Sequence, residues 1–383
     1  MQSFSLSAVP EIAFGVGRLA ELGDRAAAVA GSGAVMLIAD PALSGQGITA
    51  RARASLEDKG LRVGLFDRFT GEPKAADIDV AGQEARAAGA TCIVGLGGGS
   101  ALDTAKVVAA VAVSGLSAEA YALAATALPN DTLPIIAIPT TAGTGSEATR
   151  TSVFTDHRKA KVWAWGDVLK PRLAILDPAL TTGVPAAVTA ATGLDALVHA
   201  IEAATNRNRN PAVELYCHRA IGLIAAHLER AVADGGDLEA RSALLLGSCY
   251  AGIAIDNCGT ALAHNISHAL AALAPVPHGR ATGLAMLATM DWVLDGARDA
   301  FAAVATAMGE GAEAEQAVAA FDRLVRRSGM KVSLEGDGLD LGRADLLAAA
   351  MAAPENAPMR NSTQRTVSDA DLLMLAERVY ALR

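Results

Sequence analysis

Short apolar runs alternate with helical stretches over the first 180 residues of the chain. The apolar runs have the length and composition of buried strands, and Gly, Pro or Asp residues border them. Stretches with helical periodicity separate the runs, at 48–60 and 77–90 among others. Strands separated by helices of this length predict a parallel sheet wrapped by helical crossovers. The predicted strands are 34–40, 61–67, 91–97, 133–141 and 172–178.

From about Pro185 onward the pattern becomes helical. Helical periodicity runs through 186–205, 213–234, 238–257 and 344–354, and no segment of this half has a strand pattern. A chain of 383 residues is also long for one domain. The predicted architecture is an N-terminal α/β domain with a Rossmann-like parallel sheet (1–184), followed by an all-α C-terminal domain (185–383).

Composition narrows the class of protein. Apolar residues make up 52% of the chain, charged residues 19%, and the net charge is −9 without any basic run, which argues against nucleic acid or an anionic membrane as a partner. Charged residues or glycines interrupt the apolar runs before about 18 residues, the length that a membrane span needs. The four cysteines have no C-x-x-C spacing, and the N-terminus has no export signal, so we expect a cytoplasmic protein with reduced thiols.

Two loops of small residues follow predicted strands. The first, "VGLGGGSALDTAK" (94–106), opens a helix, and its glycines would let the backbone approach a phosphate at the helix N-terminus. It differs from the usual dinucleotide fingerprint, because Ser100 replaces the third glycine and the loop follows the third predicted strand. Alone, it fits a phosphate cradle and a tight strand-to-helix turn equally well. The second loop, "IPTTAGTGSEATRT" (138–151), would face the same crevice, which favours a cofactor.

Asp40 ends another predicted strand. A carboxylate at this position can accept hydrogen bonds from the ribose hydroxyls of NAD and would repel the 2′-phosphate of NADP. The alternative is a turn or helix-capping aspartate.

Three of the seven histidines fall within the apolar segment 261–279. His264 and His268 are four residues apart, as are Asp195 and His199, so each pair would share one helix face. Two prolines precede His278, which we expect on a loop or at a helix start. One carboxylate with three imidazoles suits a divalent transition metal, Fe²⁺ and Zn²⁺ alike. Each histidine taken alone could equally be a buried structural residue.

Five segments spread along the chain match the motifs of one known family. They are "FGVGRLAELG", "GGGSALDTAK", "IPTTAGTGSE", "LDPALTTGVPAAVTAATGLDALVHAIEA" and "HNISHALAALAPVPHG". Through these segments the sequence resembles the iron-containing (group III) alcohol dehydrogenases, which share the dehydroquinate-synthase-like fold. The spacing from Asp177 through Pro185 to Asp195 and Glu202 carries the resemblance.

The resemblance implies a role for each matching position. The metal ligands would be Asp195, His199, His264 and His278, and His268 would lie beside the metal and the nicotinamide as the catalytic proton relay. The NAD(P) pyrophosphate would lie on Gly97, Gly98, Gly99 and Ser100, with Asp103 in the same segment. Thr140, Thr141 and Thr144 would line the nicotinamide side, with Lys161 near the cofactor ribose or nicotinamide. Asp40 matches the acid of NAD-preferring members, so we expect NAD rather than NADP.

The implied reaction is hydride transfer between nicotinamide and a small alcohol or aldehyde, with the metal polarising the substrate oxygen. Members also form homodimers or larger homo-oligomers. The chain departs from the family after His268, where a usual glycine is missing, and after His278, where Arg280 stands in "GRATGLAML". Arg280 either points to solvent or favours a substrate that carries a carboxylate or phosphonate.

Three alternatives to the dehydrogenase remain at this point. A dehydroquinate-synthase-like lyase would need more basic residues around a phosphate-bearing substrate. A maleylacetate-reductase-like enzyme would act on an anionic substrate without needing a metal, which Arg280 permits and the full ligand set opposes. A non-catalytic nucleotide-binding or scaffold protein would have no use for four converging ligands.

Overall fold

The computed structural model describes residues 3–31, 33–69 and 71–383, and the chain divides into two compact units. The sheet unit contains residues 8–141 and 145–183. The helical unit contains residues 3–7, 142–144 and 184–383.

A six-stranded parallel sheet forms the centre of the sheet unit. Its strand order is β1-β8-β5-β4-β2-β3, and every pairing is parallel. The strands are β1 (Glu11–Phe14), β2 (Ala34–Ala39), β3 (Arg62–Phe66), β4 (Ala90–Gly97), β5 (Ile135–Pro139) and β8 (Leu173–Leu176). All five predicted strands are present. The edge strand β1 was not predicted, because it is not a buried apolar run: it begins with the exposed Glu11, and Ala13 is the buried residue of its four. The glycine loop therefore follows the fourth strand of the chain and not the third.

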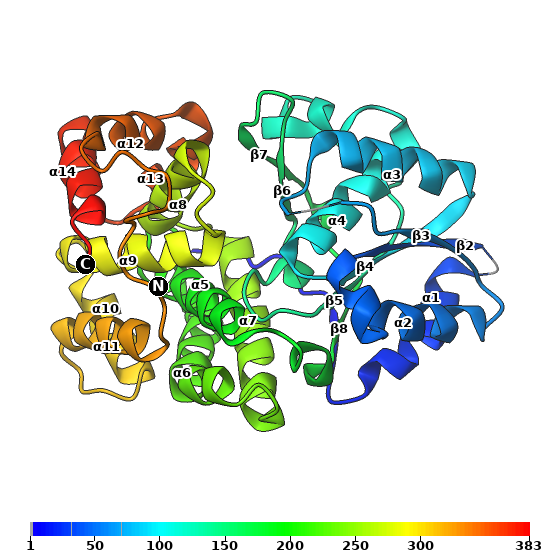
Figure 1. Cartoon of the computed structure of the whole chain (residues 1–383), viewed down its shortest axis with the longest axis horizontal. Helices are drawn as coiled ribbons and strands as arrows, with labels where there is room; N and C mark the ends of the chain where they lie inside the picture. The colour runs from blue at the N-terminus through cyan, green and yellow to red at the C-terminus, as the bar shows by residue number, and fades with distance from the viewer. Residues whose placement is uncertain (1–2, 32, 70) are drawn as a thin grey trace. The chain divides into compact units, whose positions relative to one another are not determined.

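Helices cover both faces of this sheet (Figure 1). Alternate side chains of β2 point to opposite faces, so Leu37 joins the core under α1 (Leu22–Ala30) and α2 (Ile48–Glu57). Ile38 joins the core under α3 (Ala75–Ala87) and α4 (Gly99–Ser114). Burial on both faces explains why the central strands read as continuous apolar runs.

An antiparallel hairpin was also missed from the sequence. It consists of β6 (Thr151–Thr155) and β7 (Lys161–Trp165), inserted between β5 and β8. Both strands alternate buried and partly exposed residues, and five residues around a charged turn connect them. The hairpin follows directly on the second loop of small residues.

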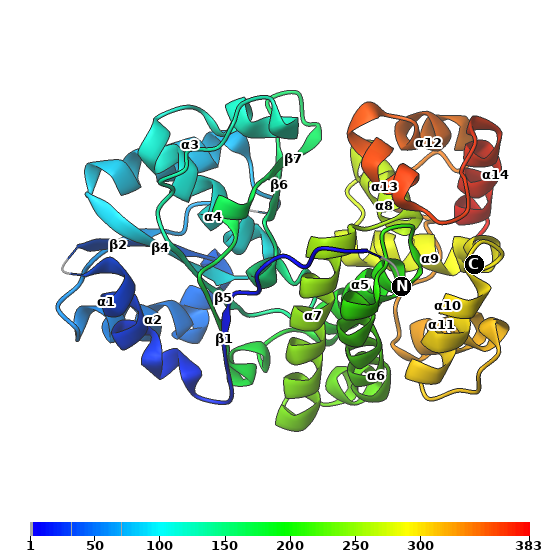
Figure 2. The same cartoon turned by 180° about the vertical axis from the view of Figure 1, so that it is seen from behind.

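The helical unit consists of ten α-helices among the described residues, and α5 runs through its centre. α6 and α7 pack against α5, as does α9 (Figure 2). The helices are α5 (Ala186–Thr205), α6 (Pro211–Ala233), α7 (Leu238–Cys258), α8 (Leu262–Leu273), α9 (His278–Leu294), α10 (Arg298–Ala307), α11 (Ala314–Arg327), α12 (Ala344–Met351), α13 (Ala357–Ser362) and α14 (Asp369–Tyr380). α7 is long and apolar enough to cross a membrane, but most of it is buried within the unit, as expected of a core helix.

Candidate metal centre and cofactor loops

Three potential metal ligands converge inside the helical unit. Asp195 and His199 lie one turn apart on α5, and His264 lies in the first turn of α8. One ligand atom from each of them lies within 4.8 Å of the other two, and all three residues are buried. His278, the first residue of α9, points its Nε2 atom to within 3.8 Å of Asp195 Oδ1.

The cluster has the size and chemistry of a site for one divalent ion. Asp195 Oδ1 lies 3.7 Å from His264 Nε2, against roughly 3.4 Å between two ligand atoms of one tetrahedral ion. This oxygen is buried and accepts no hydrogen bond from any described residue, which is costly unless a cation is its partner. Burial lowers the pKa of His199 to about 4, so its imidazole is neutral at pH 7, the form that binds metals.

In His199, His264 and His278, the ring nitrogen Nδ1 has a hydrogen-bond partner. In metal sites such a bond fixes the tautomer and the orientation of the ligand. The bonds join His264 Nδ1 to Glu202 Oε2 (2.6 Å), His278 Nδ1 to Ser267 Oγ (3.0 Å) and His199 Nδ1 to the Gly143 carbonyl oxygen (3.3 Å). Glu202 and Ser267 were not predicted as site residues. A sequence offers no signal for a partner that lies behind a ligand, although Glu202 did belong to the motif that carried the resemblance.

A glycine explains how His278 comes close to Asp195. A Cβ atom at Gly279 would lie 2.4 Å from the Ala191 carbonyl oxygen and 3.3 Å from Asp195 Cβ. Only a residue without a side chain lets the start of α9 approach α5 this closely.

His268 lies one turn beyond His264 on α8, outside the three-residue cluster. Its ring centroid is 5.6 Å from that of His278. It is therefore near the proposed ligands, and its catalytic role stays a prediction.

Arg280 does not point to solvent, so that expectation was wrong. Its side chain is buried, with Nε donating to the Lys331 carbonyl oxygen (2.9 Å). Nη2 donates to Asp337 Oδ2 (2.8 Å) and to the Ser333 carbonyl oxygen (2.5 Å). The guanidinium thus holds the 331–337 segment against α9, and these bonds use three of its five N–H donors.

In the sheet unit, the first loop of small residues has the geometry of an anion cradle. Gly97 has a φ of +150°, and a Cβ atom there would lie 2.7 Å from Ala101 Cβ and 2.8 Å from Asp40 Cβ. α4 begins at Gly99 with Gly98 as its N-cap, and no side chain caps it. The N-terminal N–H groups of α4, including that of Ser100, therefore belong to a helix end that can hold a phosphate.

Asp40 takes the turn position that was its alternative reading. Its Oδ1 accepts a hydrogen bond from Ala42 N (2.9 Å) and caps the 3-10 turn Pro41–Gln46. Its contact with NAD stays a prediction, as one carboxylate can serve both partners.

Asp103 binds protein groups of the second loop and of the hairpin. Its Oδ1 accepts from Ser146 Oγ (2.6 Å) and its Oδ2 from Val153 N (2.9 Å). Burial raises the pKa of Asp103, and the nearby Lys106 ammonium opposes the rise. These bonds make Asp103 a link between α4 and the second loop.

Lys106 completes this link and was not predicted from the sequence. Its fully buried Nζ donates to Ser146 Oγ (2.7 Å), Thr149 Oγ1 (2.9 Å) and the Thr151 carbonyl oxygen (2.7 Å). An ammonium has three donors, so these three acceptors satisfy it. The signal in the sequence was a lysine on an otherwise apolar helix, three residues after Asp103.

Of the remaining predicted cofactor residues, Thr140, Thr141 and Thr144 belong to the second loop, whereas Lys161 lies at the turn end of the hairpin, opposite Thr155. Thr140 N donates to the Gly97 carbonyl oxygen (2.9 Å), and Thr141 lies against Gly98, so the two loops touch. Lys161 Nζ donates to Glu72 Oε1 (2.6 Å). Thr144 belongs to the helical unit with residues 142–143.

Comparison with known proteins now decides the family. The model of the iron-containing alcohol dehydrogenases matches residues 10–178, and the model of the C-terminal domain of the same family matches residues 189–380. The chain belongs to the iron-containing alcohol dehydrogenase family. The predicted family and fold class are confirmed, and so is the enzyme class, an alcohol dehydrogenase or aldehyde reductase.

Similar proteins cover nearly the whole chain. A probable alcohol dehydrogenase, EutG of Salmonella typhimurium, is 35% identical over 98% of this chain and 94% of its own length. The NAD-dependent methanol dehydrogenase of Bacillus methanolicus is 32% identical over 88% of this chain and 91% of its own.

Two solved structures of the family illustrate its range. A 1,3-propanediol oxidoreductase superposes with a TM-score of 0.92 at 31% identity, covering 99% of this chain and 100% of its own. A sulfoacetaldehyde reductase of Bifidobacterium kashiwanohense in complex with NAD⁺ has a TM-score of 0.90 at 28% identity, covering all of both chains.

Proposed function

We propose that this dehydrogenase interconverts a small uncharged alcohol and its aldehyde with NAD as the hydride carrier. The ion would be held by Asp195, His199, His264 and His278. The observation that carries the proposal is the buried Asp195 Oδ1, which faces imidazole nitrogens and accepts no hydrogen bond from the described residues. A bound Fe²⁺ or Zn²⁺ would supply Lewis-acid polarisation of the substrate oxygen.

The protein's own residues would orient the reactants and move the proton. Asp195, His199 and His264 are buried, which strengthens each electrostatic contact there. His268 would take the proton that the substrate hydroxyl loses and pass it to solvent, since an imidazole is the side chain best suited to this at neutral pH.

The cofactor would lie on the glycine loop of the sheet unit. The N–H groups at the start of α4 suit the pyrophosphate, and Thr140, Thr141 and Thr144 would position the nicotinamide. Asp40 would accept hydrogen bonds from the ribose hydroxyls, and its negative charge would repel the 2′-phosphate of NADP, which favours NAD. The NAD-dependent methanol dehydrogenase and the NAD⁺ complex among the relatives support this choice.

The bonds of Arg280 favour an uncharged substrate. The anionic alternative depended on this residue, and its guanidinium is bound to Asp337 and to two backbone carbonyls. We also propose a cytoplasmic homo-oligomer of which residues 1–184 bind NAD and residues 185–383 bind the metal.

An NADH-consumption assay tests this function. Purified protein would be stripped with a chelator, reloaded with Fe²⁺ or Zn²⁺, and offered neutral and anionic aldehydes of equal length. We expect NADH oxidation with the neutral series, loss of activity on stripping, and recovery on reloading. NADH oxidation by stripped protein with anionic carbonyl compounds alone would refute the proposal.

A further inference from the structure

Glu202 lies behind the candidate ligand His264, in the last two turns of α5. It is buried, with 3% of its surface exposed. Its Oε2 accepts from Ala261 N (2.8 Å) and lies 2.6 Å from His264 Nδ1, and its Oε1 accepts from Ala263 N (2.7 Å). A buried carboxylate is costly to desolvate, and here three partners offset that cost.

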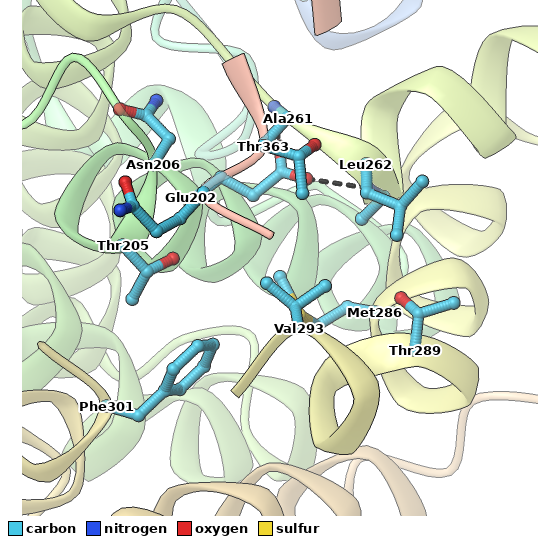
Figure 3. Close-up of a pocket in the computed structure, with 12 residues that line it drawn as sticks. Glu202, Thr205, Asn206, Ala261, Leu262, Met286, Thr289, Val293, Phe301 and Thr363 are labelled. Carbon is cyan, nitrogen blue, oxygen red and sulfur yellow. Dashed lines mark hydrogen bonds between the residues drawn. The ribbon is translucent and has the colours of Figure 1, made fainter. Parts of the chain in front are cut away.

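Two of these partners are backbone groups at the start of α8. Ala261 is the N-cap of this helix and offers no side-chain hydrogen bond of its own. Glu202 therefore supplies from α5 the cap that α8 lacks, and its negative charge lies at the positive end of the α8 dipole. Figure 3 shows Glu202 reaching toward Ala261 and Leu262 at this helix start.

The third partner is the imidazole of His264. With Nδ1–H donating to Glu202, the lone pair of Nε2 is left to face Asp195 Oδ1 at 3.7 Å. A carboxylate behind a ligating histidine fixes this tautomer and makes Nε2 more basic.

We propose that Glu202 is a positioning residue that sets the metal affinity of the site. Its carboxylate acts in two ways. It fixes the start of the helix that carries His264, and it fixes the tautomer of His264 itself. The inference rests on the proposed function, because it assumes that His264 binds the ion.

Glu202 does not fill all of the space around it. A small cavity beside it is lined mainly by apolar atoms, with Leu262, Met286, Val293 and Phe301 among the lining residues (Figure 3). Thr205, Asn206, Thr289, Thr363 and Gln364 also line this cavity, while Glu202 is the acceptor for Ala263 N and the partner of His264 Nδ1.

The test compares Glu202→Gln with wild type by Zn²⁺ competition against a chromophoric chelator. Gln has the size of Glu, but only one of its two terminal atoms can accept a hydrogen bond. The other is an NH₂ group, which would face one of the N–H donors that Glu202 now binds. We expect the Zn²⁺ dissociation constant to rise about 10- to 100-fold. In the background of His264→Ala, the same substitution should change the constant by less than about twofold, because Glu202 acts through that ring.

Asp237→Asn is the matched control, since Asp237 caps α7 in the same unit by accepting from Ala240 N and does not contact the cluster. This control should bind Zn²⁺ like wild type. Wild-type protein that takes up no Zn²⁺ would refute the proposed function. Wild-type affinity in Glu202→Gln would overturn the inference alone. Should Glu202→Gln not fold, Glu202→Asp applies the same test, and wild-type affinity in that variant would overturn it equally.

Discussion

Replacing Lys106 by Met removes the buried ammonium that ties α4 to the second cofactor loop. Its Nζ donates three hydrogen bonds of 2.7–2.9 Å, and Asp103 Oδ1 lies 3.7 Å away. Met fills a similar volume and offers no donor. The carboxylate of Asp103 then loses its nearby cation. Removing one partner of a buried ion pair lowers the free energy of unfolding by about 3–5 kcal/mol. We expect the free energy of unfolding to fall by that amount.

Urea denaturation followed by circular dichroism measures this loss, and NADH titration by fluorescence measures its effect on the cofactor. Because Lys106 fixes the second loop through Ser146 and Thr149, NADH affinity should fall at least about tenfold. Adding Asp103→Asn should restore part of the stability, since the unpaired charge is gone.

Lys59→Met serves as the control for this substitution. Lys59 forms an exposed ion pair with Asp24, so its loss should cost less than about 1 kcal/mol. Equal stability of the Lys106 and Lys59 variants would refute the reasoning, because the buried network would then contribute nothing.

Four further predictions concern the site and its surroundings. The hydrogen bond from Arg280 lowers the pKa of Asp337 in the folded protein. This bond therefore stabilises the fold fully above the pKa of Asp337 in the unfolded chain, about 4, and the stabilisation is lost as the pH falls through the lowered pKa of the folded protein. Melting temperatures of Arg280→Met measured from pH 2 to 6 should lack this loss at acid pH. Asp40→Ser, which keeps a capping side chain, should raise the ratio of kcat/KM for NADP to that for NAD, and an unchanged ratio would contradict the ribose role. His268→Ala should lower kcat while the metal content stays at the wild-type level, and metal loss would instead make His268 a ligand. Removing the metal with a chelator should lower the melting temperature, because the ion binds the folded chain, and reloading should reverse the change.

The sequence predicted the strands and helices whose patterns are long or strongly apolar. β2 and β5 are buried on both faces and α5 is twenty residues long and largely apolar, so period and composition pointed to the same element. β1 and the two strands of the hairpin β6–β7 were not predicted because they are only partly buried, whereas the equally short β8 is buried at every residue. Their pairing depends on neighbours that lie far away in the chain.

Within the candidate site, residues that share a helix turn were easier to predict than their partners. The four-residue spacing of Asp195 and His199 is a local property of α5 and is visible in the sequence. Glu202 contacts a histidine 62 residues away, and Lys106 contacts a loop 40 residues away. The bonds of Arg280 likewise reach more than 50 residues along the chain, so its burial could not be read from its neighbours.

The most direct test of the metal centre is anomalous diffraction at the iron and zinc absorption edges from crystals of the active protein. The account predicts one metal per chain, bonded to Asp195, His199, His264 and His278 at about 2.0–2.2 Å. A fully active crystal with no anomalous peak among these four residues, or with its metal bound elsewhere, would contradict it.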